Sequence, residues 1–484
     1  MSFIDRSINK ISQKTHQLVH RSTDRHVRLA VTGLSGAGKT AFITGLVNQM
    51  LHAGLQSEKS QTQNPLPLWQ VCRENRLIGI KRAMQPDLAI ASFDYKGAMT
   101  SLTQLPATWP ASTRNISELR LAIKYRPQKG ILAKLADTAT LYVDIVDYPG
   151  EWLLDLPMMK QNFIQWCESQ IDVKHRLAAS SYYPQFVSVL ANINLSETAD
   201  EHKLKQIADL YQTLLVDLVN NQGFYLAQPG RMLLPGEFAD TPLLAFFPLI
   251  NLSNDELANL ENAADSSYYQ VLKRRYEEYV SVVVKPFYRD YFASFDRQLV
   301  LVDCFNGLNS GKAQFEDMGN ALNSIVESFH FGQSSLLRRL FSPKIDKLLF
   351  AASKVDRVTR DQQSHVLSLL TDMLKHSQHF ANYEGCEVET MAISAIKATQ
   401  HGMVSTTSGE QEVVRGIDKK QQMLTIFPGE VPQRLPQDSF WDKQGFNFVS
   451  FNPPRLPQSS MSDPRFEHIR LDHLLQFLLG DKLQ

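Results

Sequence analysis

The chain has 484 residues, of which 43% are hydrophobic and 21% are charged. This length suffices for two to four domains, and the composition is that of a globular protein rather than a disordered or fibrous one. Lysine plus arginine and aspartate plus glutamate both number 50, so the charge balance gives no support for a nucleic-acid partner. The four cysteines have no CxxC spacing, and we therefore expect a reducing, cytoplasmic setting.

Residues 1–25 carry apolar side chains at helical spacing, with basic side chains between them. The apolar positions are Ile4, Ile8, Ile11 and Leu18, and the basic positions are Arg6, Lys10, Lys14 and Arg21. A basic amphipathic helix of this kind packs on the protein's own body, docks on a partner or lies on a membrane surface. Peripheral contact with the inner face of the membrane therefore stays open. No run approaches the roughly 20 apolar residues of a membrane span.

The apolar run Val27–Val31 predicts a strand, and the segment Gly33–Thr40, with the sequence GLSGAGKT, follows it. Such a segment before a helix is typical of a phosphate-binding loop, because its glycines let main-chain N–H groups close around phosphates. Lys39 would reach the β- and γ-phosphates, and the Thr40 hydroxyl would bind Mg²⁺. We predict that the nucleotide is bound here by Gly33, Ser35, Gly36, Ala37, Gly38, Lys39, Thr40 and Ala41.

Apolar, β-rich runs alternate with helical patterns along the chain, which is typical of an α/β fold with a parallel sheet. The last four of these runs end at polar residues or turn signals, as expected where the carboxyl edge of a sheet carries the site. We predict a three-layer P-loop NTPase fold. The expected strands are Val27–Thr32, Leu119–Tyr125, Leu141–Val146, Leu299–Val302, Leu348–Ala352 and Met391–Ser394.

Two long insertions separate the expected strands. Residues 154–295 are rich in helical patterns, and we interpret them as an inserted helical subdomain. A smaller insertion occupies residues 54–113. The α/β core would then consist of residues 26–153 and residues 296–484, the latter with a C-terminal extension. The helical patterns of the large insertion cover Met159–Val173, Glu201–Val219 and Ser267–Phe295.

The segment Asp144–Gly150, with the sequence DIVDYPG, ends a predicted strand and fits the Asp-x-x-Gly motif of GTPases. Asp147 would hold Mg²⁺ through a water molecule, while the N–H of Gly150 would sense the γ-phosphate. An ordinary turn that closes a buried strand is the alternative interpretation.

Ser353-Lys354-Val355-Asp356 follows another predicted strand and matches the guanine motif Asn/Thr-Lys-x-Asp, with serine in the first position. The Asp356 carboxylate can accept hydrogen bonds from both N1–H and the 2-amino group of guanine, whereas adenine offers no such paired donors. The stem of Lys354 would lie along the base. A looser match, in which an alanine N–H binds the guanine oxygen, stands at the end of the last predicted strand and comprises Ser394, Ala395 and Ile396.

A switch segment is expected between the first helix and the second strand. Our candidate is Trp109–Arg114, in which Thr113 would bind Mg²⁺ when the γ-phosphate is present and Arg114 would act as an arginine finger in cis. Ser112 is the alternative ligand. A surface turn before a strand explains this segment equally well.

Together these motifs resemble those of Ras-like GTPases, and the chain from Gly33 through the sequence DYPGEWL resembles the bacterial YcjX family of stress-associated P-loop proteins. The resemblance implies a Ras-like core, a helical insertion, GTP hydrolysis and a cytoplasmic role in the stress response. Two residues depart from the Ras-like pattern. Glu151 stands where a water-orienting glutamine is usual, and a carboxylate accepts hydrogen bonds but donates none unless it is protonated. Ser35 stands where glycine is frequent, and its side chain would crowd a finger arriving from outside.

The leading hypothesis is a GTP-hydrolysing molecular switch that uses Mg²⁺, converts GTP to GDP and acts on an unidentified protein effector. Lys39, Thr113, Arg114 and Glu151 are its predicted catalytic residues, and Thr40, Thr113 and Asp147 are its predicted metal ligands. A nucleotide-binding scaffold with little turnover and a P-loop kinase for small molecules are the alternatives. We interpret the aromatic-rich segment Phe440–Phe451 as core.

Overall fold

The computed structural model describes residues 25–55, 64–128, 137–328, 345–383, 386–407, 409–441, 446–457 and 463–484. The amphipathic helix predicted for residues 1–25 lies outside this part of the chain, except for Arg25, which begins the first strand. None of the described helices is both long enough and apolar enough to cross a membrane.

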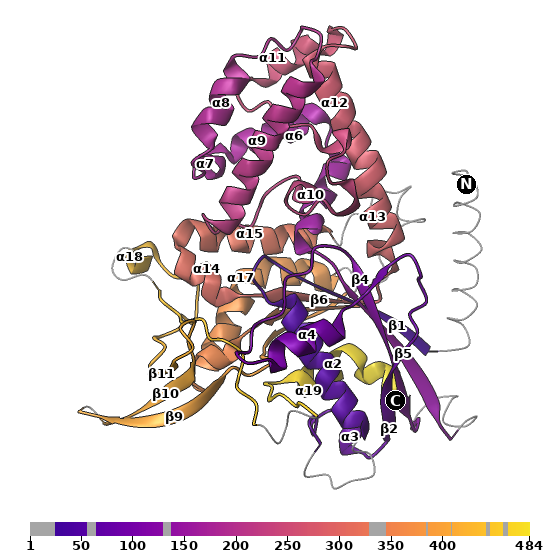
Figure 1. Ribbon diagram of the computed structural model, residues 1–484, viewed down its shortest axis with the longest axis vertical. Helices are drawn as coiled ribbons and strands as arrows, with labels where there is room; N and C mark the ends of the chain where they lie inside the picture. Colours follow the sequence, from indigo (N-terminus) through magenta and orange to yellow (C-terminus); the bar gives the residue numbers. More distant parts are fainter. Residues whose placement is uncertain are drawn as a thin grey trace.

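A mixed eight-stranded sheet forms the centre of the molecule (Figure 1). Its main order is β2-β4-β5-β1-β6-β7-β8, and the short β3 pairs with β4. The strands are β1 (Arg25–Gly33), β2 (Leu77–Ala83), β3 (Ala91–Ser92), β4 (Ser117–Tyr125), β5 (Ala139–Asp147), β6 (Arg297–Val302), β7 (Lys347–Ala352) and β8 (Glu387–Ala392). Five of the six expected strands are present, the sixth, Met391–Ser394, overlaps β8 only at Met391 and Ala392, and the α/β class is confirmed. The last one ends at Ala392, so that Ser394 lies in the loop beyond it.

The prediction of a parallel sheet is wrong for one half of it. Strands β5, β1, β6, β7 and β8 are parallel, whereas β4 is antiparallel to β5 and β2 is antiparallel to β4. β4 and β5 follow each other in the chain and lie side by side in the sheet, and neighbours of this kind commonly form an antiparallel pair. The expected strand sequences carried no information about direction.

The strands of the core are buried on both faces because helices cover both. In β1, Val27, Leu29 and Val31 pack in one apolar cluster with α2 (Lys39–Leu55) and α19 (Leu471–Leu479). Ala30, which points to the opposite face, belongs to a second cluster. That cluster includes side chains of α14 (Cys304–Ser310), α15 (Lys312–Ser328) and α17 (Gln362–Tyr383). The remaining helices of the core are α3 (Gln70–Arg73), α4 (Tyr95–Thr103), η8 (Val355–Arg357) and η10 (Gly480–Leu483).

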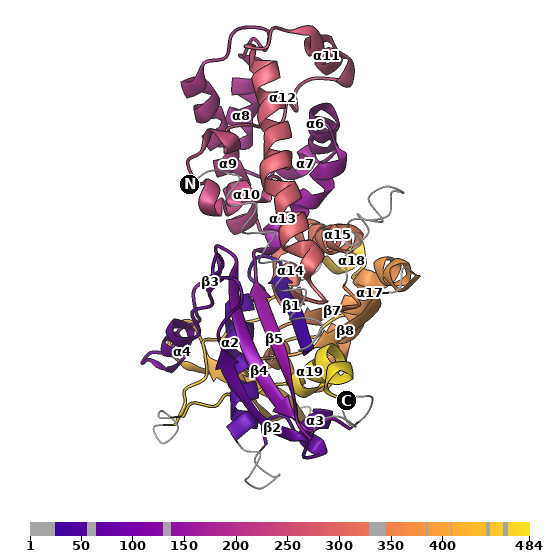
Figure 2. The ribbon, with the colours of Figure 1, turned by 90° about the vertical axis from the view of Figure 1, so that its right-hand side faces the viewer.

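A helical subdomain stands away from one end of the sheet (Figures 1 and 2). It packs around aromatic side chains, with Trp166 stacked on Tyr276 at 5.2 Å between ring centroids. Its helices are α6 (Phe163–Asp172), α7 (Lys174–Leu177), α8 (Tyr183–Ala191), α9 (Glu201–Asn220), α10 (Gly230–Leu233), α11 (Asn254–Asn259), α12 (Tyr268–Tyr279), the π-helical turn η6 (Val280–Val284) and α13 (Lys285–Asp290). Short 3₁₀ turns are η3 (Gly236–Phe238), η4 (Pro242–Leu244), η5 (Leu260–Asn262) and η7 (Phe292–Ser294).

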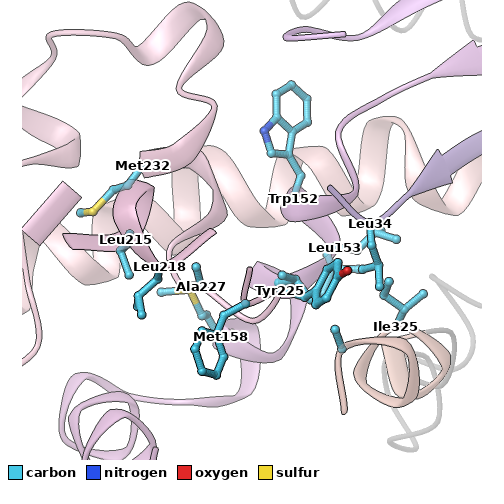
Figure 3. Packing of buried hydrophobic residues seen from close by; sticks show 14 of the residues in the cluster. Leu34, Trp152, Leu153, Met158, Leu215, Leu218, Tyr225, Ala227, Met232 and Ile325 are labelled. Atoms are coloured by element: carbon cyan, nitrogen blue, oxygen red, sulfur yellow. The ribbon is translucent and has the colours of Figure 1, made fainter. Parts of the chain in front are cut away.

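The 3₁₀ segment η2 (Gly150–Lys160) joins this subdomain to the sheet. Figure 3 shows Trp152, Leu153 and Met158 of η2 among buried side chains that come from both parts, including Leu34 beside the sheet and Leu215 in α9. One continuous apolar cluster therefore runs from the core into the helical subdomain.

The C-terminal extension contains structure that the sequence did not predict. A separate three-stranded antiparallel sheet has the order β11-β10-β9, formed by β9 (Thr399–Thr406), β10 (Gly409–Ile417) and β11 (Met423–Ile426). The short helix α18 (Asp438–Trp441) follows it. The chain then returns to the core, where α19 packs its leucines against the central sheet.

Candidate functional site

A cavity of about 340 Å³ lies at the carboxyl ends of β1, β7 and β8. Gly36 and Gly38 have φ angles of +78° and +84°, a conformation that side chains with a Cβ rarely adopt, so the loop before α2 needs glycine there. Twelve predicted site residues line this cavity: Gly36, Ala37, Gly38, Lys39, Thr40, Ala41, Thr113, Lys354, Asp356, Ser394, Ala395 and Ile396.

The three predicted metal ligands lie together. The Oγ1 atoms of Thr40 and Thr113 are 3.1 Å apart, and the Thr113 hydroxyl donates a hydrogen bond to Oδ2 of Asp147. Asp147 is 1% exposed, and its Oδ1 has no hydrogen-bond partner in the described part of the chain. Burial raises the pKa of Asp147 to about 6, although the Lys39 charge and the Thr113 hydroxyl act in the opposite direction. This set of oxygen atoms, one of them buried and unpaired, fits Mg²⁺.

Gly150 lies directly against the phosphate-binding loop. A Cβ atom on Gly150 would lie 2.3 Å from the main-chain oxygen of Gly33, so only glycine allows this approach. The same oxygen accepts a hydrogen bond of 3.4 Å from Nζ of Lys39. The Asp-x-x-Gly segment is therefore placed beside the loop that would hold the phosphates.

The predicted base-binding residues are fixed by the loops around them. Oδ1 of Asp356 accepts a hydrogen bond of 2.7 Å from the Ser394 hydroxyl, and Oδ2 accepts one of 2.8 Å from the N–H of Ala398. The Ser353 hydroxyl donates to the main-chain oxygen of Ala37 at 3.0 Å. The Thr399 hydroxyl also lies 3.5 Å from Oδ2, whereas Oδ1 keeps a further lone pair for a ligand. The Asp356 carboxylate is thus oriented before any ligand arrives.

Lys354 connects the base-binding loop with the phosphate-binding loop. It has a φ of +60°, and its Nζ donates to the main-chain oxygen of Gly36 at 2.7 Å and to Oδ2 of Asp303 at 2.6 Å. Its Cε lies 3.5 Å from the position of a Cβ on Gly38. The aliphatic stem of Lys354 therefore lies across the cavity wall, where a flat base can pack on it.

Asp303 is a residue that the sequence analysis did not select. It follows β6, its side chain is 4% exposed, and it also accepts a hydrogen bond of 3.1 Å from the N–H of Asn306 at the start of α14. Burial raises the pKa of Asp303, but Lys354 and Arg357 outweigh this effect and the net shift is downward. The sequence signal that could have identified Asp303 is its position as a polar residue directly after the predicted strand Leu299–Val302.

Asp303→Asn is expected to weaken binding of guanine nucleotides by about tenfold, because the amide keeps an oxygen for the Asn306 N–H but loses the charge that fixes Lys354. The affinity can be measured by titration with a fluorescent GDP derivative. Asp200→Asn is a matched control, since Asp200 also accepts an N-terminal N–H in a helix, α9, and does not line the cavity. Equal losses in both variants, or no loss at Asp303, would contradict this role.

The structure does not bring Arg114 or Glu151 to the cavity wall. Arg114 is exposed, and neither residue is among those that line the cavity. Oε2 of Glu151 is buried and has no hydrogen-bond partner in the described residues, and its main-chain oxygen is 2.1 Å from the position of a Cβ on Gly230. The predicted catalytic roles of Arg114 and Glu151 stay predictions, as does the nucleotide contact of Ser35, which is half-buried in the loop.

The residues after Gly150 contact the helical subdomain closely. The Trp152 indole N–H donates to the main-chain oxygen of Leu234 at 3.1 Å, and the guanidinium carbon of Arg231 lies 3.3 Å from the centroid of the same ring system. Asp155, whose pKa burial raises to about 6, accepts hydrogen bonds from the N–H of Gly230 at 2.7 Å and the Tyr279 hydroxyl at 2.5 Å. A movement of Gly150 would therefore change the packing of α10 and α12.

The cavity also has a second wall, of which the sequence indicated only the predicted switch segment Trp109–Arg114 and not the C-terminal part. Trp109, Pro110 and Ser112 line it from the segment before β4. From the C-terminal extension come Lys419, Ser450, Phe451 and Asn452. The aromatic run was interpreted as core. Phe448 and Phe451 are 3% exposed, but Phe440 is 44% exposed, and the interpretation also missed the contribution of Phe451 to the cavity.

A family model described as "YcjX-like family, DUF463" matches residues 27–483. The chain belongs to the YcjX-like family. A protein of Shewanella oneidensis named "Ras-like GTPase YcjX" is 66% identical over the full length of both chains. A protein of Escherichia coli K12 with the same name is 41% identical over 99% of this chain and all of that protein.

These matches confirm both the family and the P-loop fold that the sequence predicted. They extend beyond the sheet and its phosphate-binding loop. The helical subdomain and the C-terminal wall of the cavity both lie within the residues matched by the YcjX-like family model.

Proposed function

We propose that this chain binds GTP together with Mg²⁺, hydrolyses it to GDP and phosphate, and acts as a nucleotide-dependent molecular switch. The proposal rests on the position of the Asp356 carboxylate. This group lines the same cavity as the phosphate-binding loop and is held by hydrogen bonds from Ser394 and Ala398. Guanine presents two adjacent donors to a carboxylate, and adenine does not. The curated relatives named Ras-like GTPase support this proposal.

Lys39 would bind oxygens of the β- and γ-phosphates, and the main-chain N–H groups of the loop would surround them. Thr40, Thr113 and Asp147 would hold Mg²⁺, which when bound neutralises negative charge on the phosphates. The N–H of Gly150 would donate to the γ-phosphate. Once this phosphate leaves, Thr113 and Gly150 lose the contacts that hold them in place. The conformations with and without the γ-phosphate would be the two states of the switch.

Glu151 would orient the attacking water only as an acceptor, because an ionised carboxylate has no proton to donate. Arg114, three residues before the start of β4, is the proposed source of positive charge at the γ-phosphate. The carboxylate of Glu151 in place of a glutamine favours slow hydrolysis, and it supports a second candidate function, a nucleotide-dependent scaffold with little turnover. The alternative function, a small-molecule kinase, would leave the guanine motif Ser353–Asp356 unexplained.

On the resemblance to the YcjX family we also propose a cytoplasmic role in the bacterial stress response. An unidentified effector protein would read the nucleotide state. Peripheral membrane contact through residues 1–25 belongs to this proposal too.

The purified full chain is expected to bind GTP at least about tenfold more tightly than ATP when Mg²⁺ is present, since the site is built to pair with guanine. Calorimetric titration with each nucleotide measures this ratio, and phosphate release without an added acceptor measures hydrolysis. Equal affinities, or a preference for ATP, would refute guanine recognition. Tight GTP binding without phosphate release would favour the scaffold.

A further inference from the structure

The wall made by the C-terminal extension deepens the proposed function and rests on it. Lys419 and the segment Ser450–Asn452 line the same cavity as Lys39 and Asp356, although they lie far from both in the sequence. We call Ser450–Asn452 the C-terminal strap. A ligand that fills the cavity therefore meets two separate parts of the fold, the end of the central sheet and the strap.

The C-terminal strap is fixed to the small sheet. The main-chain N–H of Asn452 donates to the oxygen of Ile417 at 2.8 Å, and its side-chain amide donates to the oxygen of Asp418 at 2.6 Å. The ring of Phe451 fills the space beside Gly416, where a Cβ would lie 2.6 Å from Cδ1 of the ring. The strap and the end of β10 are thus one packed unit.

The small sheet is in turn attached to the base-binding loop. β9 begins at Thr399, whose hydroxyl donates to the main-chain oxygen of Asp356. A ring nitrogen of His401 lies 3.0 Å from the oxygen of Val358. A shift of β9 would therefore disturb the loop that carries Asp356.

Trp109 connects the C-terminal strap with the predicted Mg²⁺ site on the other side of the cavity. Its indole N–H donates to the main-chain oxygen of Phe451 at 2.9 Å, and its side chain is 38% exposed. Four residues later, Thr113 contacts Thr40 and Asp147 at the predicted Mg²⁺ site. The segment Trp109–Thr113 thus spans from the strap to the metal ligands.

We propose that Trp109 and the C-terminal strap form a clasp over the bound guanine nucleotide, and that the nucleotide is released only after the hydrogen bond between Trp109 and Phe451 has broken. Thr113 would hold the clasp segment through Mg²⁺ in the GTP state. After hydrolysis this hold weakens, and the bond to the strap becomes the contact that keeps the segment in place. The C-terminal extension would then set the rate of GDP release.

The test uses the full chain loaded with the fluorescent N-methylanthraniloyl derivative of GDP in the presence of Mg²⁺, followed by excess unlabelled GDP. Trp109→Phe keeps an aromatic ring but removes the indole donor. We expect release to be about three- to tenfold faster, as loss of one hydrogen bond implies, with little change in the association rate. Trp441→Phe is the matched control, because Trp441 in α18 packs against Phe315 of α15 and does not line the cavity.

A second variant separates the clasp from a local effect at Trp109. Phe451→Ala keeps the main-chain oxygen but loosens the C-terminal strap on Gly416, so it should also speed release. If both residues act through one contact, the double variant is faster than wild type by less than the product of the two single effects. Thermal melting of each variant shows whether it is folded.

The possible results are distinct. Faster release in Trp109→Phe, with a coupled effect of Phe451→Ala, supports the clasp. Unchanged release in Trp109→Phe overturns the clasp while leaving guanine-nucleotide binding intact. Failure of the wild-type chain to hold the GDP derivative overturns the proposed function, and the clasp with it.

Discussion

Lys39→Ala is expected to reduce GTP hydrolysis by at least about a hundredfold, and to weaken binding of GTP more than binding of GDP. Lys39 lines the cavity at the start of α2, and its Nζ reaches back to the main-chain oxygen of Gly33. Alanine would leave the charge of the γ-phosphate without its lysine partner. Single-turnover phosphate release and nucleotide titration measure the two effects separately.

Lys39→Arg should fail as well, because a planar guanidinium does not fit a loop shaped around a compact ammonium group. Lys205→Ala is the control for a lost lysine. This residue pairs with Asp209 on the surface of α9, and its side chain is 54% exposed, so wild-type turnover is expected. Persistent turnover in Lys39→Ala would mean that the activity resides elsewhere on the molecule.

The helical subdomain connects the proposed switch at the nucleotide site with a more distant part of the molecule. Gly150 touches the phosphate-binding loop, while Trp152, two residues later, donates to Leu234 and packs under Arg231. Only one residue lies between these two contacts. A displacement of Gly150 on loss of the γ-phosphate would therefore change the packing against α10, and an effector that binds the helical subdomain would detect it.

The parts of the site that could be predicted from the sequence are those coded locally. Gly36 and Gly38 have positive φ angles that glycine supports, and Thr40 follows them by fixed spacing at the start of a helix. The strand ends at Asp147 and Ala352 follow from apolar runs that stop at polar residues. Because each of these signals spans fewer than about ten residues, periodicity and turn chemistry suffice to find it.

The parts that escaped prediction depend on contacts between residues far apart in the chain. Asp303 matters because Lys354 folds against it, and Phe451 lines the cavity because Trp109 binds its oxygen across 342 positions. Neither pairing leaves a local pattern. The antiparallel direction of β4 has the same origin, since alternating apolar residues read alike in both directions.

Asp356→Asn is expected to remove the preference for guanine. The amide oxygen can still accept from the N–H of Ala398, and the Ser394 hydroxyl can accept from the new amide N–H while it donates to the main-chain oxygen of Ile396, which lies 3.0 Å away. The loop should therefore keep its shape. The amide donor, however, would face the N1–H and 2-amino donors of guanine, and we expect the GTP affinity to fall by at least about a hundredfold.

The same substitution should create affinity for xanthosine triphosphate, because xanthine carries a carbonyl oxygen where guanine carries the 2-amino group and can accept from the asparagine N–H. Competition of GTP, ATP and xanthosine triphosphate against the fluorescent GDP derivative measures the full profile, with Asp209→Asn on the surface of α9 as the control. A general loss of all nucleotides would indicate a collapsed loop rather than altered recognition. An unchanged ratio of GTP to ATP affinity would show that Asp356 does not contact the base. The protein can distinguish guanine from adenine only through the hydrogen-bond donors and acceptors at the edge of the base, so a residue that recognises guanine must contact that edge.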